Sequence, residues 1–168
     1  MVLSARVHPG ETVASWMMKG LIDFLIGNTR EAEYLREKYV FKIVPMLNID
    51  GVINGNYRTS LLGVDLNRRW KQPLKFVHPI IYSFKQLIKT FRIAYPIELI
   101  ADFHGHSRNH NIFAYGCNDI TRPEVCKLYP FILSKLSPIF TFRGCRFKVQ
   151  KSKESTLRVA LYKELSVH

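Results

Sequence analysis

The sequence predicts an α/β domain built on an open sheet. Two apolar runs, 40–47 and 97–103, are dense enough to form strands buried within a sheet. Two longer stretches, 12–27 and 77–95, instead repeat their apolar residues at helical spacing. With 168 residues, of which 47% are hydrophobic and 23% charged, the chain amounts to one domain that can bury a core.

The first helix is predicted directly after the turn His8-Pro9-Gly10-Glu11, which follows a short apolar run. Its apolar residues continue to a stop signal at Gly27-Asn28. We expect Trp16 and Met17 on this helix to be core residues. A second helix, short and charged, is expected over 32–38.

A long loop, 48–67, follows the first predicted strand, and loops of this length are often functional. The stretch 77–95 predicts an amphipathic helix with Lys85 and Lys89 on its solvent side. We expect His78 there to be structural. The run 97–103 then predicts a strand that ends directly before His104.

Three further elements are expected downstream. The run 112–116 predicts a strand, and 122–137 predicts a helix that Pro130 must bend or divide. The alternation over 140–149 predicts a strand or an extended surface segment.

His8 and Glu11 lie three residues apart at the predicted strand-to-helix turn, so their side chains can converge on one point. A catalytic zinc commonly takes two histidines and one carboxylate, and keeps a fourth position for water. His104 is the natural third ligand, because ligand sites in open α/β sheets lie at the carboxyl ends of strands. His106 and His110 are rival ligands.

Asp102, two residues before His104, has two interpretations. It could orient a ligating imidazole, or strand alternation could place it elsewhere.

A His-x-x-Glu pair such as His8 and Glu11 is, taken alone, a weak signal of a metal site.

Further motifs follow in order, Asn48-Ile49-Asp50-Gly51-Val52, Asn56-Tyr57-Arg58 and Gly63-Val64-Asp65-Leu66-Asn67-Arg68, before Phe103-His104-Gly105-His106. With these, the chain resembles the M14 zinc carboxypeptidases from about Leu3 to Val167. Within them it is most similar to the cytosolic carboxypeptidases, which trim glutamates from tubulin and other acidic tails. The resemblance implies an open mixed sheet with helices on both faces, and one zinc held by His8, Glu11 and His104.

The resemblance also implies roles for four other residues. Asn67 and Arg68 would hold the terminal carboxylate of a substrate, and Arg58 would polarise the scissile carbonyl and stabilise its oxyanion. Arginine suits these roles because its planar fork grips a carboxylate through two hydrogen bonds. Arg158 falls where the family shapes the pocket for the departing side chain, and a cation there would favour glutamate or aspartate.

The general base of the family lies in a strand beyond the counterpart of 164–167, so we expect it beyond His168. We expect neither Glu154 nor Glu164 to replace it. Residues 1–168 are therefore expected to form a partial zinc carboxypeptidase domain, with an incomplete sheet and without the base.

The composition limits the kinds of binding partner and the cellular compartments that suit the protein. Twenty-five Lys and Arg against thirteen Asp and Glu give a net charge of +12, which attracts acidic peptides or nucleic acid. No run reaches the roughly 18 to 20 apolar residues of a membrane span, and no secretory signal is recognised. Cys117, Cys126 and Cys145 form no Cys-x-x-Cys pair and suit a reducing compartment. We expect a cytoplasmic protein, associated with microtubules or cilia if tubulin is the substrate.

Two other functions fit parts of the sequence. A zinc amidohydrolase of N-acyl amino acids could use the same three ligands. A non-catalytic basic module could bind acidic tails or nucleic acid. Nucleic acid is the weaker partner, because the aromatic residues fall mostly on predicted core faces rather than among exposed cations.

Overall fold

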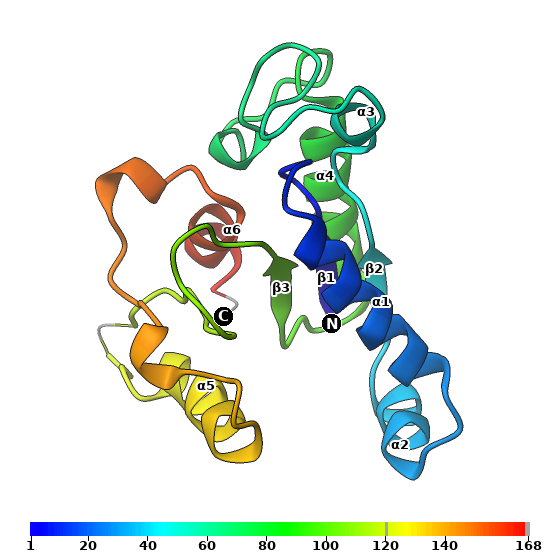
Figure 1. Cartoon of the computed structure of the whole chain (residues 1–168), viewed down its shortest axis with the longest axis vertical. Helices are drawn as coiled ribbons and strands as arrows, with labels where there is room; N and C mark the ends of the chain where they lie inside the picture. The colour runs from blue at the N-terminus through cyan, green and yellow to red at the C-terminus, as the bar shows by residue number, and fades with distance from the viewer. Residues whose placement is uncertain (120, 167–168) are drawn as a thin grey trace.

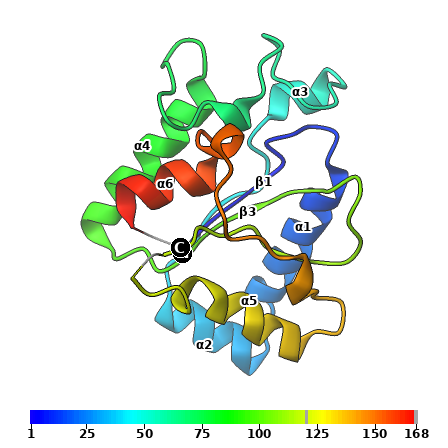
Figure 2. The same cartoon turned by 90° about the vertical axis from the view of Figure 1, so that its left-hand side faces the viewer.

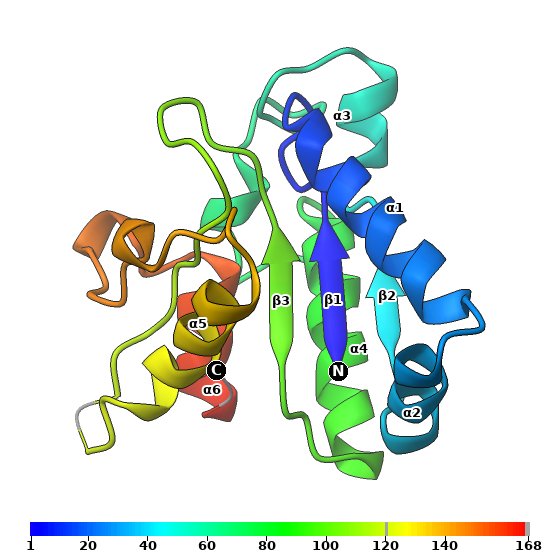
Figure 3. The ribbon, with the colours of Figure 1, turned by 60° about the horizontal axis from the view of Figure 1, so that its bottom comes forward.

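A three-stranded parallel sheet in the order β2-β1-β3 forms the centre of the computed structural model (Figure 3). The structure describes residues 1–119 and 121–166. The strands are β1 (Val2–Ala5), β2 (Lys42–Val44) and β3 (Ile100–Phe103). Leu3 pairs with Ile43 on one side and Ala101 on the other. The predicted α/β class with an open sheet is confirmed, and the described strands all run parallel.

Helices cover both faces of the sheet, as predicted. The helix α1 (Thr12–Ile26) packs through Ala14 and Met18 on one face, against Leu3 and Ala5 of β1. The helices α4 (Pro79–Ala94) and α6 (Leu157–Leu165) form the main core with Val2 on the other face. Figure 2 shows α6 beside α4. This division follows from strand alternation, since neighbouring residues of β1 point to opposite faces.

The remaining elements are shorter or lie outside the sheet. The helix α2 (Arg30–Lys38) follows α1, and α3 (Ile49–Ile53) and the 3-10 turn η1 (Leu66–Arg68) lie within the long loop. The helix α5 (Val125–Leu136) and the 3-10 turns η2 (Phe142–Gly144) and η3 (Lys151–Lys153) lie beyond the β3 edge (Figure 1). Among the described residues, no helix is long and apolar enough to cross a membrane.

Three downstream predictions were only partly right. The predicted strand 112–116 and the segment 140–149, expected as a strand or an extended surface segment, meet only at isolated parallel bridges, Ile112 with Phe140 and Tyr115 with Arg146. The turn η2 interrupts their pairing between these two points. The helix α5 includes Pro130 and is not divided by it.

Two solvent-exposure predictions were wrong. Trp16 is 71% exposed, because Ala14 and Met18 are the α1 residues that face the sheet. Lys85 is only 4% exposed. Its Nζ donates to the carbonyls of Trp70 and Lys71 and pairs with the Glu164 carboxylate of α6, so burial leaves it fully hydrogen-bonded.

Candidate metal centre

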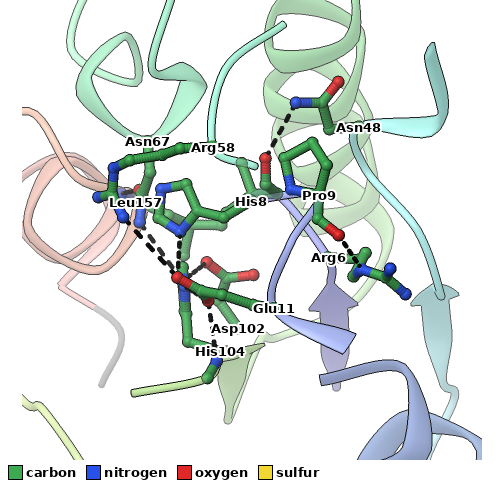
Figure 4. A network of polar contacts seen from close by, with 12 residues as sticks. Arg6, His8, Pro9, Glu11, Asn48, Arg58, Asn67, Asp102, His104 and Leu157 are labelled. Carbon is green, nitrogen blue, oxygen red and sulfur yellow. Dashed lines mark hydrogen bonds and ion pairs between the residues drawn. The ribbon is translucent and has the colours of Figure 1, made fainter. Parts of the chain in front are cut away.

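Three predicted ligands, His8, Glu11 and His104, meet at the carboxyl edge of the sheet (Figure 4). Glu11 Oε1 lies 2.9 Å from His8 Nδ1, and Glu11 Oε2 lies 3.0 Å from His104 Nδ1. One ligand atom from each residue lies within 4.8 Å of the other two. Because β1 and β3 are neighbouring parallel strands, their carboxyl ends bring His8 and His104 to the same edge.

The turn that carries His8 is held by Arg6. Arg6 has a left-handed backbone, with φ of 59°, an unusual conformation for a residue with a side chain. Its Nε donates to the Pro9 carbonyl at 2.7 Å, and its Nη1 donates to Ser15 Oγ at 2.7 Å. These contacts fix the turn between β1 and α1, and with it the approach of His8 to Glu11.

The long loop is tied to the same turn. Asn48 donates through Nδ2 to the carbonyls of Val7 and Thr59, each at 3.2 Å. Gly10 donates to the Tyr57 carbonyl at 2.7 Å, and a Cβ on Gly10 would lie 2.6 Å from the Tyr57 ring. Only glycine allows this approach, which places the loop against the ligands.

A carboxylate contacts the far side of each imidazole. Asp65 Oδ1 lies 3.1 Å from His8 Nε2, and Asp102 Oδ2 lies 2.6 Å from His104 Nε2. Such partners keep the proton on Nε2 and leave Nδ1 to ligate a metal. Two imidazole nitrogens and a carboxylate, oriented in this way, fit zinc.

Of the two interpretations of Asp102, this contact favours the one in which it orients the His104 imidazole. Asp65 was not predicted to contact a ligand. The sequence feature that could have indicated this role is the position of Asp65 in the motif Gly63-Val64-Asp65-Leu66-Asn67-Arg68, two residues before Asn67.

The charges at the centre stabilise one another. Burial disfavours the charged form of His104, but Asp102 and Glu11 outweigh it and raise the pKa of His104 to about 10. Asp65 and Glu11 likewise raise the pKa of His8 against its burial. Burial opposes ionisation of the Glu11 carboxyl, yet the two histidines hold its pKa well below its usual range. The metal-free chain therefore carries protons that a metal ion would displace.

The rival ligands lie outside this group. His106 Nδ1 accepts hydrogen bonds from the backbone N–H groups of Arg108 and Asn109, and its side chain is exposed. His110 is also exposed. Within 1–119 and 121–166, the side chains grouped closely enough to hold a metal are His8, Glu11 and His104.

Two arginines flank the centre and share one carboxylate. Arg58 Nε donates to Asp65 Oδ2 at 3.0 Å, and Arg58 Nη1 lies 3.8 Å from Glu11 Oε1. Arg68 Nη1 donates to the Asn67 carbonyl at 2.9 Å and lies 4.0 Å from Asp65 Oδ2. Both side chains are partly exposed, so they can also bind an incoming anion.

The side chain of Asn67 is buried and hydrogen-bonded within the protein, which the sequence did not indicate. It is only 7% exposed. Its Oδ1 accepts the Leu157 N–H at 3.0 Å, and its Nδ2 lies 3.3 Å from His104 Nε2. The amide thus joins the start of α6 to the metal centre.

Arg158 and Lys153 add positive charge beside the centre. Arg158 follows Leu157, donates to the Gly116 carbonyl and lies over the Tyr115 ring. Lys153 was not singled out by the sequence patterns. Burial and the positive charges of Arg68, Arg58 and Arg158 lower the pKa of Lys153, which means that the four cations lie within electrostatic reach.

A histidine pair and a glutamate at the edge of a parallel sheet, with a carboxylate behind each imidazole, form a candidate metal centre. The zinc carboxypeptidase family, peptidase M14, matches residues 1–137. The chain therefore belongs to the zinc carboxypeptidase family, as its motifs had indicated. The family implies zinc as the metal for the group His8, Glu11 and His104.

Curated relatives place the chain near the cytosolic carboxypeptidases. Cytosolic carboxypeptidase 2 of Xenopus tropicalis is 49% identical over 168 residues, covering 98% of this chain and 17% of that protein. Human cytosolic carboxypeptidase 1 is 48% identical over 181 residues, covering 98% of this chain and 15% of that protein. The chain thus spans less than a fifth of the length of these relatives.

Solved structures share the fold. A metallo-carboxypeptidase from Burkholderia cenocepacia superposes with a TM-score of 0.86 at 24% identity, covering 99% of this chain and 45% of that one. A metallo-carboxypeptidase from Pseudomonas aeruginosa superposes with a TM-score of 0.82 at 25% identity and the same coverage.

Proposed function

We propose that this chain provides the metal-binding and substrate-binding half of a zinc metallocarboxypeptidase. Its substrates would be acidic protein tails, such as those of tubulin, from which C-terminal glutamate is removed. The observation that carries the proposal is the group His8, Glu11 and His104 with Arg58 and Arg68 directly beside it. The family and the names of the curated relatives support a peptidase over an amidohydrolase or a binding module.

Each cation beside the centre has a proposed role. Zinc, when bound, would supply Lewis acidity and a nucleophile derived from water. Arg58, between Asp65 and Glu11, would bind the scissile carbonyl and stabilise the negative charge that develops on its oxygen. Arg68 would hold the terminal carboxylate, with Asn67 positioning it, since the Asn67 carbonyl accepts a hydrogen bond from Arg68.

The preference for glutamate would come from Arg158 and Lys153. Their positive charges suit a substrate side chain with a carboxylate.

The general base is proposed to lie beyond His168. The described carboxylates around the ligands are Asp65 and Asp102, and each is engaged with an imidazole. Glu164 pairs with Lys85 and Lys89 of α4, which supports the expectation that it is not the base. The natural enzyme would act in the cytoplasm, on microtubules or in cilia.

Peptide binding tests the substrate-binding half of the proposal. The zinc-loaded chain should bind an acidic peptide with a free C-terminal glutamate about 10-fold to 100-fold more tightly than its C-terminal amide, a range expected for charged hydrogen bonds. Arg68→Ala should remove the difference, whereas the exposed Arg108→Ala should keep it. Equal binding of acid and amide by the parent would refute the proposed carboxylate grip.

Hydrolysis tests the assignment of the base. The 168-residue chain should release no glutamate, while a longer chain with the following strand of the family should release it when zinc is bound. Robust zinc-dependent release by the short chain would show that the base lies within it.

A further inference from the structure

A groove of about 630 Å³ lies away from the metal ligands, between α5 and the segment that follows η2. Three of its lining residues are cationic, Lys127, Arg146 and Lys148, although the surface that they line is mainly apolar. All three residues are exposed. Phe147 and Val149, which are half-buried, supply apolar lining.

Backbone pairing builds one wall of this cationic groove. Gly116 donates to the Arg146 carbonyl at 3.0 Å, and Asn118 donates to the Phe147 carbonyl at 2.9 Å. A Cβ on Gly116 would lie 2.8 Å from the Phe147 ring, so the glycine lets the ring pack against this wall. Paired backbone therefore forms one wall of the groove, and α5 contributes Lys127 on the other side.

The sequence around the groove is strongly basic. The stretch 125–153 contains five lysines and two arginines, but no aspartate and no glutamate. The three basic residues that line the groove all come from this stretch. An anionic partner is thus favoured, and no carboxylate in the lining opposes it.

A continuous set of contacts links the groove to the metal centre. His104 lies against Asn67, and Asn67 accepts the Leu157 N–H at the start of α6. The next residue, Arg158, donates to the carbonyl of Gly116, whose own N–H pairs with the groove wall. The proposed specificity residue Arg158 therefore lies between the metal centre and the groove.

We propose that the cationic groove binds an acidic stretch of polypeptide. The inference rests on the proposed function in taking this stretch as the part of a substrate tail that precedes its C-terminal residue. The apolar lining suits the methylene groups of glutamate side chains, while the three cations suit their carboxylates. Single-stranded nucleic acid is less favoured, because base stacking needs exposed aromatic platforms and the lining offers one half-buried ring, Phe147.

The test uses fluorescence anisotropy with a labelled oligoglutamate peptide whose C-terminus is amidated. The amide removes the terminal carboxylate, so binding at the proposed Arg68 grip does not contribute. The triple variant Lys127→Gln, Arg146→Gln, Lys148→Gln should weaken binding about tenfold, as expected for the loss of three exposed ion pairs.

A matched control separates the groove from overall charge. The triple variant Arg30→Gln, Lys38→Gln, Lys75→Gln removes the same number of lysines and arginines from exposed positions elsewhere, and it should bind about as well as the parent. Equal weakening in both variants would overturn the proposal, as would tighter binding of a single-stranded oligonucleotide than of the peptide.

This experiment fails or succeeds independently of the proposed function. It needs neither hydrolysis nor zinc, because the amidated peptide has no terminal carboxylate for the proposed Arg68 grip. Groove binding without any preference for a free C-terminus would refute the proposed carboxylate grip alone. A preference for the free C-terminus with no effect of the groove variant would refute the groove alone.

Discussion

Asp65 Oδ1 lies 3.1 Å from Nε2 of His8, on the opposite side of the ring from the Glu11 carboxylate. The other oxygen of Asp65 accepts a hydrogen bond from Arg58. One carboxylate therefore fixes both a proposed metal ligand and a proposed substrate-binding arginine. Asp65 therefore holds Arg58 beside the proposed ligand His8.

Asp65→Asn should lower the affinity for zinc about 10-fold to 100-fold, as is typical for a lost carboxylate behind a ligating histidine. A neutral amide no longer favours the required tautomer of His8. Competition with a chromophoric zinc chelator measures the change. Asp50→Asn, an exposed carboxylate on α3, serves as the control, and equal affinities for both variants would contradict the role of Asp65.

Arg6→Ala should lower the free energy of unfolding by about 1–3 kcal/mol, because it removes the hydrogen bonds to Pro9 and Ser15. Arg6→Gly loses the same bonds but relaxes a left-handed backbone, which costs about 1 kcal/mol for other residues. Glycine should therefore be the more stable variant in urea unfolding. Alanine at least as stable as glycine would show that the backbone strain is not significant.

Zinc binding should release about one proton or more at pH 7, since His104 has a pKa of about 10 in the metal-free chain and a ligating Nδ1 must be unprotonated. The raised pKa also means that protonated His104 stabilises the metal-free fold fully below pH 6.5. This stabilisation is lost as the pH rises through about 10. Calorimetry in buffers of different ionisation enthalpy counts the protons, and a count of zero would contradict the ion-paired centre.

Lys85→Met should lower the free energy of unfolding by about 3–5 kcal/mol, because it leaves Glu164 and two backbone carbonyls without the buried cation that they share. Lys89→Met removes the second, 47% exposed partner of Glu164 and should cost less than about 1 kcal/mol. Urea unfolding compares the two. Similar losses would show that burial of Lys85 does not matter for stability.

Local patterns predicted the framework of this site. The turn His8-Pro9-Gly10-Glu11 and the strand before His104 are specified by residues close to each other in sequence, so the sequence indicated both the ligands and the edge where they meet. The pairing of Asp65 with His8 joins residues 57 positions apart. Periodicity carries no information about such a contact.

Burial was harder to predict than element type. The apolar pattern of α1 gave a helix but did not tell which side faces the sheet, and the small Ala14 and the flexible Met18 lie there instead of Trp16. Lys85 looked like a solvent-facing residue by its charge. It is buried because Glu164, 79 positions away, and the carbonyls of 70–71 satisfy its ammonium group.

The central claim is that His8, Glu11 and His104 form a zinc site, and metal content tests it most directly. Elemental analysis of the purified chain should give about one zinc per chain. His104→Ala should lose the metal, while the exposed His106→Ala should retain it. A folded parent chain without zinc, or His104→Ala with full zinc content, would contradict the claim.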